Sequence, residues 1–440
     1  MLRRSSTYLL LAVLGLAMPA SAQTPLSLTD AIALARTQNP DAGSSAAAER
    51  EAAQRVTQAR AGYWPRVDFA ESWQRGNQPV FVFSSLLAQR QFTAADFALG
   101  ALNHPAALDN FRSAVTVEQP VFDGVARANV TVAGIGHEMA SATRQVVDHD
   151  LAASVTDAYG RVLAAAGTRR SADAAVETAR ADRELAGNRR DAGLVTDADV
   201  LQIDVHLSRA REQQIVAASD ERIARARLNQ LMGVSLGEVF LLEPAPAVTM
   251  IDVTDLARLE MEAIEHRPDV ALAVLQERLA GASQTAARAT FLPQVSAQGG
   301  WELNGSVWNS RSSGWIVGAV ARVNVFNGFA DKARLTEADE RAARSALERT
   351  KVETAARLDV HAAAARLDAA RASDAVGRDA VAQARESRRI IRDRYEAGLT
   401  DVTSLLRSAE AVAQAEAQQV AAQAAILTAS AALQRALGRR

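Results

Sequence analysis

The sequence of 440 residues contains no cysteine, so it can form no disulfide and has no cysteine to which a lipid could be attached. Beyond its N-terminus it has no apolar run long enough to cross a bilayer as a helix. A formal net charge of −2 gives no indication of a nucleic-acid partner. There is no P-loop and no nucleophile elbow, and the six histidines form no pair at ligand spacing. The sequence therefore predicts neither an enzyme nor a cofactor or metal site.

Proline is absent from residues 121–243 and 294–440, although the chain has 11 prolines. Both stretches become rich in alanine, arginine and glutamate after Gly124 and Gly328. Because proline breaks helices and alanine favours them, each stretch allows very long helices. A helix between Gly124 and Gly193 would reach about 100 Å, at about 1.5 Å per residue.

The N-terminus has the layout of a secretory signal peptide, which we assign to residues 1–22. Arg3 and Arg4 precede an apolar run, and Ala20-Ser21-Ala22 forms a small-residue cleavage site. The run is too short for a membrane-spanning helix, although a retained anchor is the alternative. We therefore expect an exported protein without a lipid anchor.

Short motifs occur twice along the chain, which indicates one structural unit that was duplicated and fused. The paired motifs are Asn39-Pro40-Asp41 with Arg267-Pro268-Asp269, Tyr63-Trp64-Pro65 with Phe291-Leu292-Pro293, Gln119-Pro120-Val121-Phe122-Asp123-Gly124 with Val323-Asn324-Val325-Phe326-Asn327-Gly328, Asp191-Ala192-Gly193-Leu194 with Glu396-Ala397-Gly398-Leu399, and Leu231-Met232-Gly233 with Ala436-Leu437-Gly438. We expect an internal two-fold structural repeat.

Small apolar residues at alternating spacings of four and three predict a coiled-coil seam along the first long helix of each repeat. The rest of the helix surface is charged, so these helices need neighbours on a narrow stripe and leave wide faces in water. The expected seams are Leu151, Val155, Ala158, Val162 and Ala165 in the first repeat, and Leu358, Ala362, Ala365, Ala369 and Ala372 in the second.

Aromatic residues are scarce in the helical stretches and gather in residues 63–122 and 291–329, which contain all five tryptophans. In both windows the hydrophobic period becomes two, which is typical of strands with one apolar and one polar face. The apolar series are Trp315, Val317, Ala319, Ala321, Val323 and Val325 in the second window, and Phe111, Val115, Val117 and Val121 in the first.

Apolar-out, polar-in strands with aromatics near their ends are typical of a transmembrane β-barrel. A soluble sandwich shows the same alternation, but one hairpin per repeat is too little to build one. Four strands cannot close a barrel with a lumen, and a membrane does not tolerate an open sheet edge. Several chains must therefore contribute to one barrel.

These features together, in this order and in two copies, resemble the TolC family of outer-membrane efflux proteins. The resemblance implies a mixed α/β membrane protein and a homotrimer, in which each chain gives four strands to a 12-stranded barrel continued by a long periplasmic α-helical barrel. The expected first repeat is 23–243 (hairpin about 65–122, long helices about 125–190 and 197–232). A linker 244–255 joins it to the second repeat, 256–440 (hairpin about 293–326, long helices about 329–396 and 402–437). Each repeat would begin with a short helix, Leu28 to Gln38 or Leu256 to Glu265.

The family also implies a gate at the periplasmic tip, where the long helices turn at Gly193 and Gly398. Asp199 and Tyr395 occupy the positions of a hydrogen-bonded link between helix hairpins; helix capping and packing are their alternative roles. Ser404 and Arg407 stand where some members have two aspartates, and Thr400 where some have a basic gate residue. A lumenal Arg407 would make a cationic ring, with Asp401 nearby; a solvated face is the alternative.

The resemblance also implies that a periplasmic adaptor docks at the tip turns, at Gly193, Leu194, Gly398 and Leu399. The expected partners are a periplasmic adaptor, an inner-membrane pump of RND, ABC or MFS type, and outer-membrane lipid. An exit duct for an efflux pump in a Gram-negative outer membrane is the preferred function. The outer duct of a type I protein secretion system and an exported trimeric coiled-coil scaffold or adhesin are the alternatives.

The first hairpin has 24 residues more than the second, around Gln74 to Asn110. We expect a longer extracellular loop there, with Pro79 and Pro105 breaking its regularity. This loop could cover the pore mouth or only decorate it.

Overall fold

The computed structural model describes residues 25–244 and 251–439. The expected signal peptide 1–22 lies outside these residues, as do residues 245–250 of the expected linker 244–255. Among the described residues, no helix is both long and apolar enough to cross a bilayer. Two compact units divide this part of the chain, one with residues 25–39, 152–244 and 367–431, the other with 40–151, 251–366 and 432–439.

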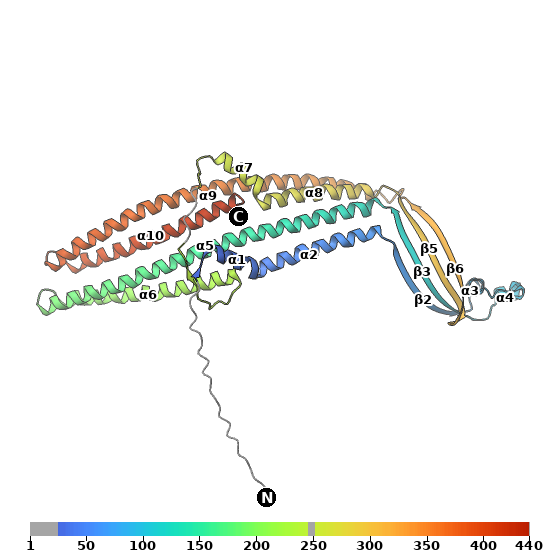
Figure 1. Cartoon of the computed structure of the whole chain (residues 1–440), viewed down its shortest axis with the longest axis horizontal. Coiled ribbons are helices and arrows are strands. Elements are labelled where there is room, and N and C mark those ends of the chain that lie inside the picture. The colour runs from blue at the N-terminus through green and yellow to red at the C-terminus, as the bar shows by residue number, and fades with distance from the viewer. Residues whose placement is uncertain (1–24, 245–250, 440) are drawn as a thin grey trace, which may run out of the picture. The chain divides into compact units, whose positions relative to one another are not determined.

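The second unit contains a four-stranded antiparallel sheet in the order β2-β3-β5-β6 (Figure 1). Its strands are β2 (Arg66–Gly76), β3 (Leu108–Phe122), β5 (Gln294–Val307) and β6 (Ser310–Arg322). In the described chain β2 and β6 each pair on one side only, so the sheet has two open edges. A register shift between Pro120 and Phe122 marks a bulge where β3 leaves the sheet.

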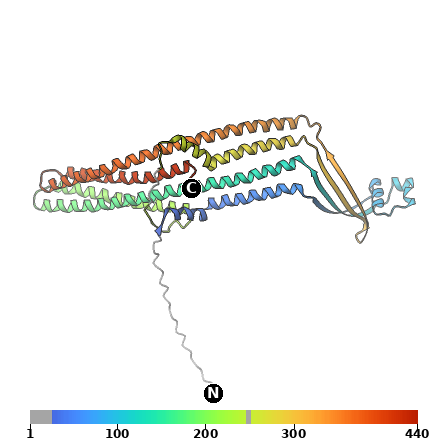
Figure 2. The same cartoon turned by 45° about the horizontal axis from the view of Figure 1, so that its top comes forward.

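Four long helices form two hairpins, visible in both Figure 1 and the turned view of Figure 2. They are α5 (Gly124–Asp191), α6 (Asp197–Met232), α9 (Ala330–Glu396) and α10 (Val402–Ala436). Their bounds lie within one or two residues of the expected ranges. The absence of proline inside them and the glycines at their turns are the physical reason.

In each half, two shorter helices precede the first strand of the four-stranded sheet, and sequence reasoning expected only the first of the two. The expected ones are α1 (Leu28–Gln38) and α7 (Leu256–His266). The others, α2 (Pro40–Arg60) and α8 (Pro268–Ala289), were missed. Pro40 and Pro268 are the first residues of these helices, where the missing N–H costs nothing. Proline starts a helix at both places rather than ending one.

One of the two expected helical seams is wrong. In the first repeat Leu151, Val155, Ala158 and Val162 are buried as expected. In the second, Leu358 is 67% exposed, and the buried stripe lies two residues earlier along the helix. Alanine occupies so many positions of α9 that several stripes have the same spacing, and the larger Val360 and Leu367 mark the real one. The buried stripe is Ala356, Val360, Ala363, Leu367 and Ala370.

The expected long loop of the first hairpin is also corrected, because it is largely helical. It contains α3 (Pro79–Ala88), the 3-10 turn η2 (Ala94–Phe97) and α4 (Leu99–Asn103). Pro79 is the first residue of α3 and so starts regular structure instead of interrupting it. Pro105 lies between α4 and β3. In Figure 1 this insertion lies at the end of the sheet opposite to α2 and α8.

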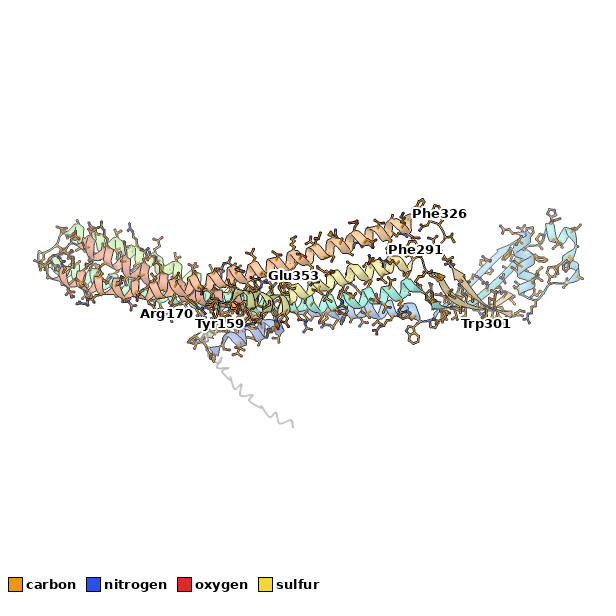
Figure 3. All side chains as sticks on the ribbon, turned by 90° about the horizontal axis from the view of Figure 1, so that it is seen from above. Tyr159, Arg170, Phe291, Trp301, Phe326 and Glu353 are labelled. Atoms are coloured by element: carbon orange, nitrogen blue, oxygen red, sulfur yellow. The ribbon has the colours of Figure 1, made fainter. Side chains whose placement is uncertain are left out.

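In the first unit a small parallel pair joins β1 (Pro25–Leu26) to β4 (Leu241–Leu242), which falls just before the expected linker. The buried Tyr159, labelled in Figure 3, fixes this pair. Its hydroxyl lies 2.9 Å from the Leu26 carbonyl oxygen and 2.6 Å from that of Glu243. Burial raises the pKa of Tyr159 to about 12, so it stays a neutral donor.

The recurrent Met-Gly and Leu-Gly pairs have a physical cause. Gly233 and Gly438 end α6 and α10 with φ of +73° and +71°, which favours glycine. A Cβ on Gly233 would collide with the Gln38 carbonyl at the end of α1. A Cβ on Gly438 would lie 2.6 Å from the carbonyl carbon of His266 at the end of α7. Each unit therefore packs a long helix end against a short helix through a glycine.

Candidate functional site

The tip turns of the first unit have the same backbone in both hairpins. Gly193 and Gly398 adopt φ of +75° and +74°. The Leu194 N–H donates to the Arg189 carbonyl over 2.8 Å, and the Leu399 N–H donates to the Arg394 carbonyl over 2.8 Å. These are Schellman motifs, which satisfy the last carbonyls of a helix. Both leucines remain about two-thirds exposed, at 65% and 68%.

Asp199 acts as a helix cap. Its carboxylate accepts hydrogen bonds from the Thr196 N–H (2.9 Å) and hydroxyl (2.8 Å), while its own N–H donates to the Thr196 hydroxyl. This reciprocal capping box satisfies donors at the start of α6. The capping role, which the sequence left as an alternative, is the one that the structure shows.

The expected Asp199–Tyr395 hydrogen bond is not formed in the described chain, where the Asp199 carboxylate caps α6 instead. The Tyr395 side chain is buried against Ala186, Ile203 and Leu405. Its hydroxyl has no hydrogen-bond partner among the described residues. Burial raises the pKa of Tyr395; the Arg189 charge lowers it and the Asp199 charge raises it. The Asp199 charge thus affects the pKa of Tyr395, although the two side chains form no hydrogen bond.

Arg189 makes the link between hairpins that sequence reasoning missed. From the last turn of α5, its Nη1 donates to the Tyr395 carbonyl and, over 2.6 Å, to the Glu396 carbonyl. Its guanidinium carbon also lies 4.9 Å from the Tyr395 ring centroid. A cation at the C-terminus of α9 is favoured by the helix dipole. The only sequence signal was the arginine pair at the end of α5.

A second link lies one heptad earlier on both helices, between Asp182 and Arg388. The Asp182 side chain is fully buried, and its Oδ2 accepts from Arg388 Nη2 over 2.9 Å. Its Oδ1 has no hydrogen-bond partner among the residues described. A buried charge with one partner depends strongly on that partner.

His206 on α6 lies within the field of this second link. Burial lowers its pKa, and so do the charges of Arg388 and Arg209. The carboxylates of Glu410 and Asp182 act in the opposite direction. The imidazole is therefore held neutral near pH 7.

The start of α10 carries the remaining expected gate residues. Asp401 accepts from the Ser404 N–H over 2.8 Å, and hydrogen bonds from Ser404 hold the pKa of Asp401 below its usual value. The Arg407 charge lowers it further. Arg407 is exposed and Thr400 is half-buried. Asp401 and Ser404 thus act as a cap, while the Arg407 side chain is open to solvent in this chain.

In the second unit, the register gives the sheet one face that is polar along its length and one face that is apolar in the part next to the helices. On one face Phe69, Val115, Trp301 and Trp315 form a row across all four strands. Trp315 and Phe69 are 78% and 69% exposed, so this apolar row is not covered by the chain itself. The other face carries polar residues, including Asp68, Ser72, Gln74, Asn110, Arg112, Thr116, Glu118, Gln298, Glu302, Asn304 and Ser312.

Further aromatic residues mark the end of the sheet that joins the helices. Figure 3 shows Phe291 and Phe326 there, and Trp301 further along the strands. β5 begins only at Gln294, so about seven residues of strand, or about 23 Å, separate its start from Trp301.

The recurrent strand-to-helix motif, expected at Pro120, Phe122, Asp123 and Gly124, is a capped turn. The Asp123 carboxylate accepts from the N–H groups of Val125 (2.8 Å) and Ala126 (3.0 Å). Capping at Asp123 fixes where β3 ends and α5 begins.

Its second copy, Phe326-Asn327-Gly328, is held differently. Asn327 Oδ1 accepts from the Asp331 N–H over 3.4 Å, and Gly328 has a φ of +69°. The Phe326 and Phe329 rings stack edge to face, 5.3 Å apart. The two motif copies thus make the same transition with an acid in one and an amide in the other.

The model of the outer membrane efflux protein family matches residues 31–234 and 259–439. The chain belongs to this family, the TolC family of outer-membrane channels. The family consists of channel proteins and not of enzymes. Efflux across the outer membrane, transport and a β-barrel are the properties that the members share.

Individual relatives agree with this assignment. The chain is 29% identical to Protein CyaE of Bordetella pertussis over 89% of this chain and 79% of that protein. Its fold resembles the outer membrane protein VceC of Vibrio cholerae, with a TM-score of 0.79, 19% identity and 94% and 96% coverage of the two chains. It also resembles the CmeC outer membrane channel of Campylobacter jejuni, with a TM-score of 0.81, 14% identity and 93% and 85% coverage.

Proposed function

We propose that three copies of this chain form the exit duct of a tripartite efflux pump in the outer membrane of a Gram-negative bacterium. The observation that carries this proposal is the four-stranded sheet with two open edges and one exposed apolar face. In lipid an open edge leaves backbone groups without partners, so β6 of one copy must pair with β2 of the next. Three copies would close a 12-stranded barrel.

The two faces of the sheet fit this barrel. The row Phe69, Val115, Trp301 and Trp315 would face lipid, and the polar face would line water. On the polar face Arg112 and Glu302 form an ion pair with 2.8 Å between nitrogen and oxygen. Charges of both signs there favour a wide aqueous path rather than a selective filter.

The helix hairpin tips of the first unit are the proposed periplasmic gate, with Asp199, Tyr395, Thr400, Ser404 and Arg407 around it. Within one copy, the two hairpins are joined by Arg189 on Tyr395 and Glu396. Charge-assisted hydrogen bonds of this kind contribute about 1.5–3 kcal/mol each. Three copies could therefore hold the tip closed and still let a partner open it.

The exposed Leu194 and Leu399, at the turns of Gly193 and Gly398, are the proposed docking elements for a periplasmic adaptor. An inner-membrane pump of RND, ABC or MFS type would supply the energy, because a channel passes solute only downhill. If Arg407 faces the lumen at the tip, three copies would form a cationic ring and favour anions.

Deletion of the gene in its own host tests the transport direction and the cargo class. Accumulation of a fluorescent efflux substrate, restored to normal by the gene in trans, is the expected result. A host that keeps normal accumulation but loses one large secreted protein would instead establish the secretion duct. Point variants of Trp301, tested beside the deletion, would show whether the membrane sheet is needed in either case.

A further inference from the structure

The insertion between β2 and β3, residues 79–107, is fastened to the polar face of the sheet. Gln89 Nε2 donates to Asn110 Oδ1 over 3.0 Å, and Asn110 Nδ2 donates to Asn304 Oδ1 over 3.0 Å. The Ser312 hydroxyl donates to the Gln89 carbonyl over 2.9 Å. Asn110, Asn304 and Ser312 belong to the polar face by register, so the insertion lies on the side that the proposed function assigns to the lumen.

The same segment spans the sheet from one open edge to the other. It follows the end of the edge strand β2 at Gly76. At the opposite edge, Arg90 Nη2 donates to the Ser313 carbonyl of β6 over 3.0 Å. Both edges are where neighbouring copies must pair, so each insertion lies next to the insertion of the next copy.

The insertion has almost no charge left for its outer surface. Arg90 and Asp96 are its only charged residues apart from His104. Arg90 binds β6, and the Asp96 carboxylate accepts from the Thr93 N–H and hydroxyl over 2.7 and 2.8 Å. Both charged side chains therefore have hydrogen-bond partners within the chain itself.

Beside its exposed polar residues, the insertion exposes large apolar side chains. Val80 is 82% exposed, Leu99 77%, and Phe97 65%. On the lumenal side of a barrel these residues cannot meet lipid tails. Left in water they would form an unfavourable apolar surface at a pore mouth. A second copy of the same surface is the partner that removes them from water.

We propose that residues 79–107 form a cap over the outer mouth of the channel, in which Val80, Phe97 and Leu99 of neighbouring copies contact one another. This inference rests on the proposed trimeric duct. It assigns the extra length of the first hairpin to closure of the mouth rather than to decoration. Solute passage would require the three apolar contacts to separate.

Cysteine crosslinking tests the contact, because the chain has no cysteine of its own. Leu99→Cys, Phe97→Cys and Val80→Cys proteins, oxidised as purified oligomers, are expected to give a covalent dimer in at least one case. Val317→Cys is the matched control, since Val317 is 73% exposed on the apolar sheet face and would face lipid. Dimers in none of the three insertion variants would overturn the cap.

Single-channel conductance of the variant that crosslinks gives a functional readout. Oxidation should lower its conductance at least twofold, and a thiol reductant should restore it, while Val317→Cys stays unchanged. Replacement of residues 79–107 by a short Gly-Ser turn should raise conductance. A conducting trimer that is indifferent to oxidation and to the deletion would overturn the cap alone. A protein that is not an oligomer and does not conduct would contradict the duct itself.

Discussion

At the scale of single residues, the tip is held by arginine rather than by the expected Asp199–Tyr395 bond. Arg189 and Tyr395 are far apart in sequence, and only the fold brings the guanidinium to the end of α9. Sequence reasoning could place Asp199 and Tyr395 in the tip region, because the turn glycines set their positions. It could not show which side chain reaches across, since this depends on helix rotation.

Arg189→Gln is expected to loosen the tip, because it removes a charge-assisted link between hairpins worth about 1.5–3 kcal/mol. Larger or longer openings in a planar bilayer would show this. Arg190→Gln is the matched control, as Arg190 is exposed and pairs with its neighbour Asp191. Equal openings in both variants and in the wild type would show that Arg189 is not part of the gate.

Arg388→Met should destabilise the protein by about 3–5 kcal/mol, because it leaves the Asp182 carboxylate buried and unpaired. The double variant Asp182→Leu/Arg388→Met should recover most of that loss. Denaturation followed by tryptophan fluorescence measures both. Additive losses in the double variant would mean that the pair is not coupled.

The neutral state of His206 predicts an acid-sensitive tip. Because burial lowers its pKa, the folded state binds this proton less readily than the unfolded chain. Stability contributed by His206 is therefore present above its ordinary pKa of about 6.5 and is lost as the pH falls through the folded-state value. Wild-type openings should become more frequent near pH 5 than at pH 7. His206→Gln should show a flatter pH dependence, and an unchanged profile would exclude this histidine.

At the scale of elements, substitutions of a turn glycine can distinguish an effect on folding from an effect on docking. Gly193 has a left-handed φ and open space where a Cβ would lie. Asparagine tolerates this backbone, whereas a β-branched residue costs about 1–2 kcal/mol.

Gly193→Asn should therefore keep a stable oligomer and lose efflux in cells with the complete pump, while Gly193→Val should also lose thermal stability. Full efflux activity in Gly193→Asn would show that the turn does not contact an adaptor.

The long helices could be predicted well from sequence because two local signals agree, the absence of proline inside and glycine at the turns. Proline misled where it begins an element, so α2, α8 and α3 were missed. The seam of α9 was misplaced because alanine fits at almost every position, and only Val360 and Leu367 distinguish the buried stripe. Strand faces could be predicted from the period of two, but the helical insertion and its attachment through Gln89 depend on contacts across the sheet.

At the scale of the whole molecule, one copy of the chain is incomplete and needs further copies beside it. The described chain leaves β2 and β6 unpaired and leaves an apolar row of aromatic residues exposed. Both features are unfavourable in an isolated copy. A closed oligomeric barrel in a membrane would pair the two strands and cover the apolar row with lipid. The gate, the adaptor sites and the outer cap all presuppose that barrel.

Whether copies of the chain share one barrel is tested by the single-channel conductance of the purified oligomer, with its mass determined in the same preparation. We expect a trimer that inserts into a planar bilayer and gives uniform, discrete conductance steps. A folded trimer that gives no steps even with Arg189→Gln and without residues 79–107 would contradict the duct, and conductance from a monomer would contradict the shared barrel.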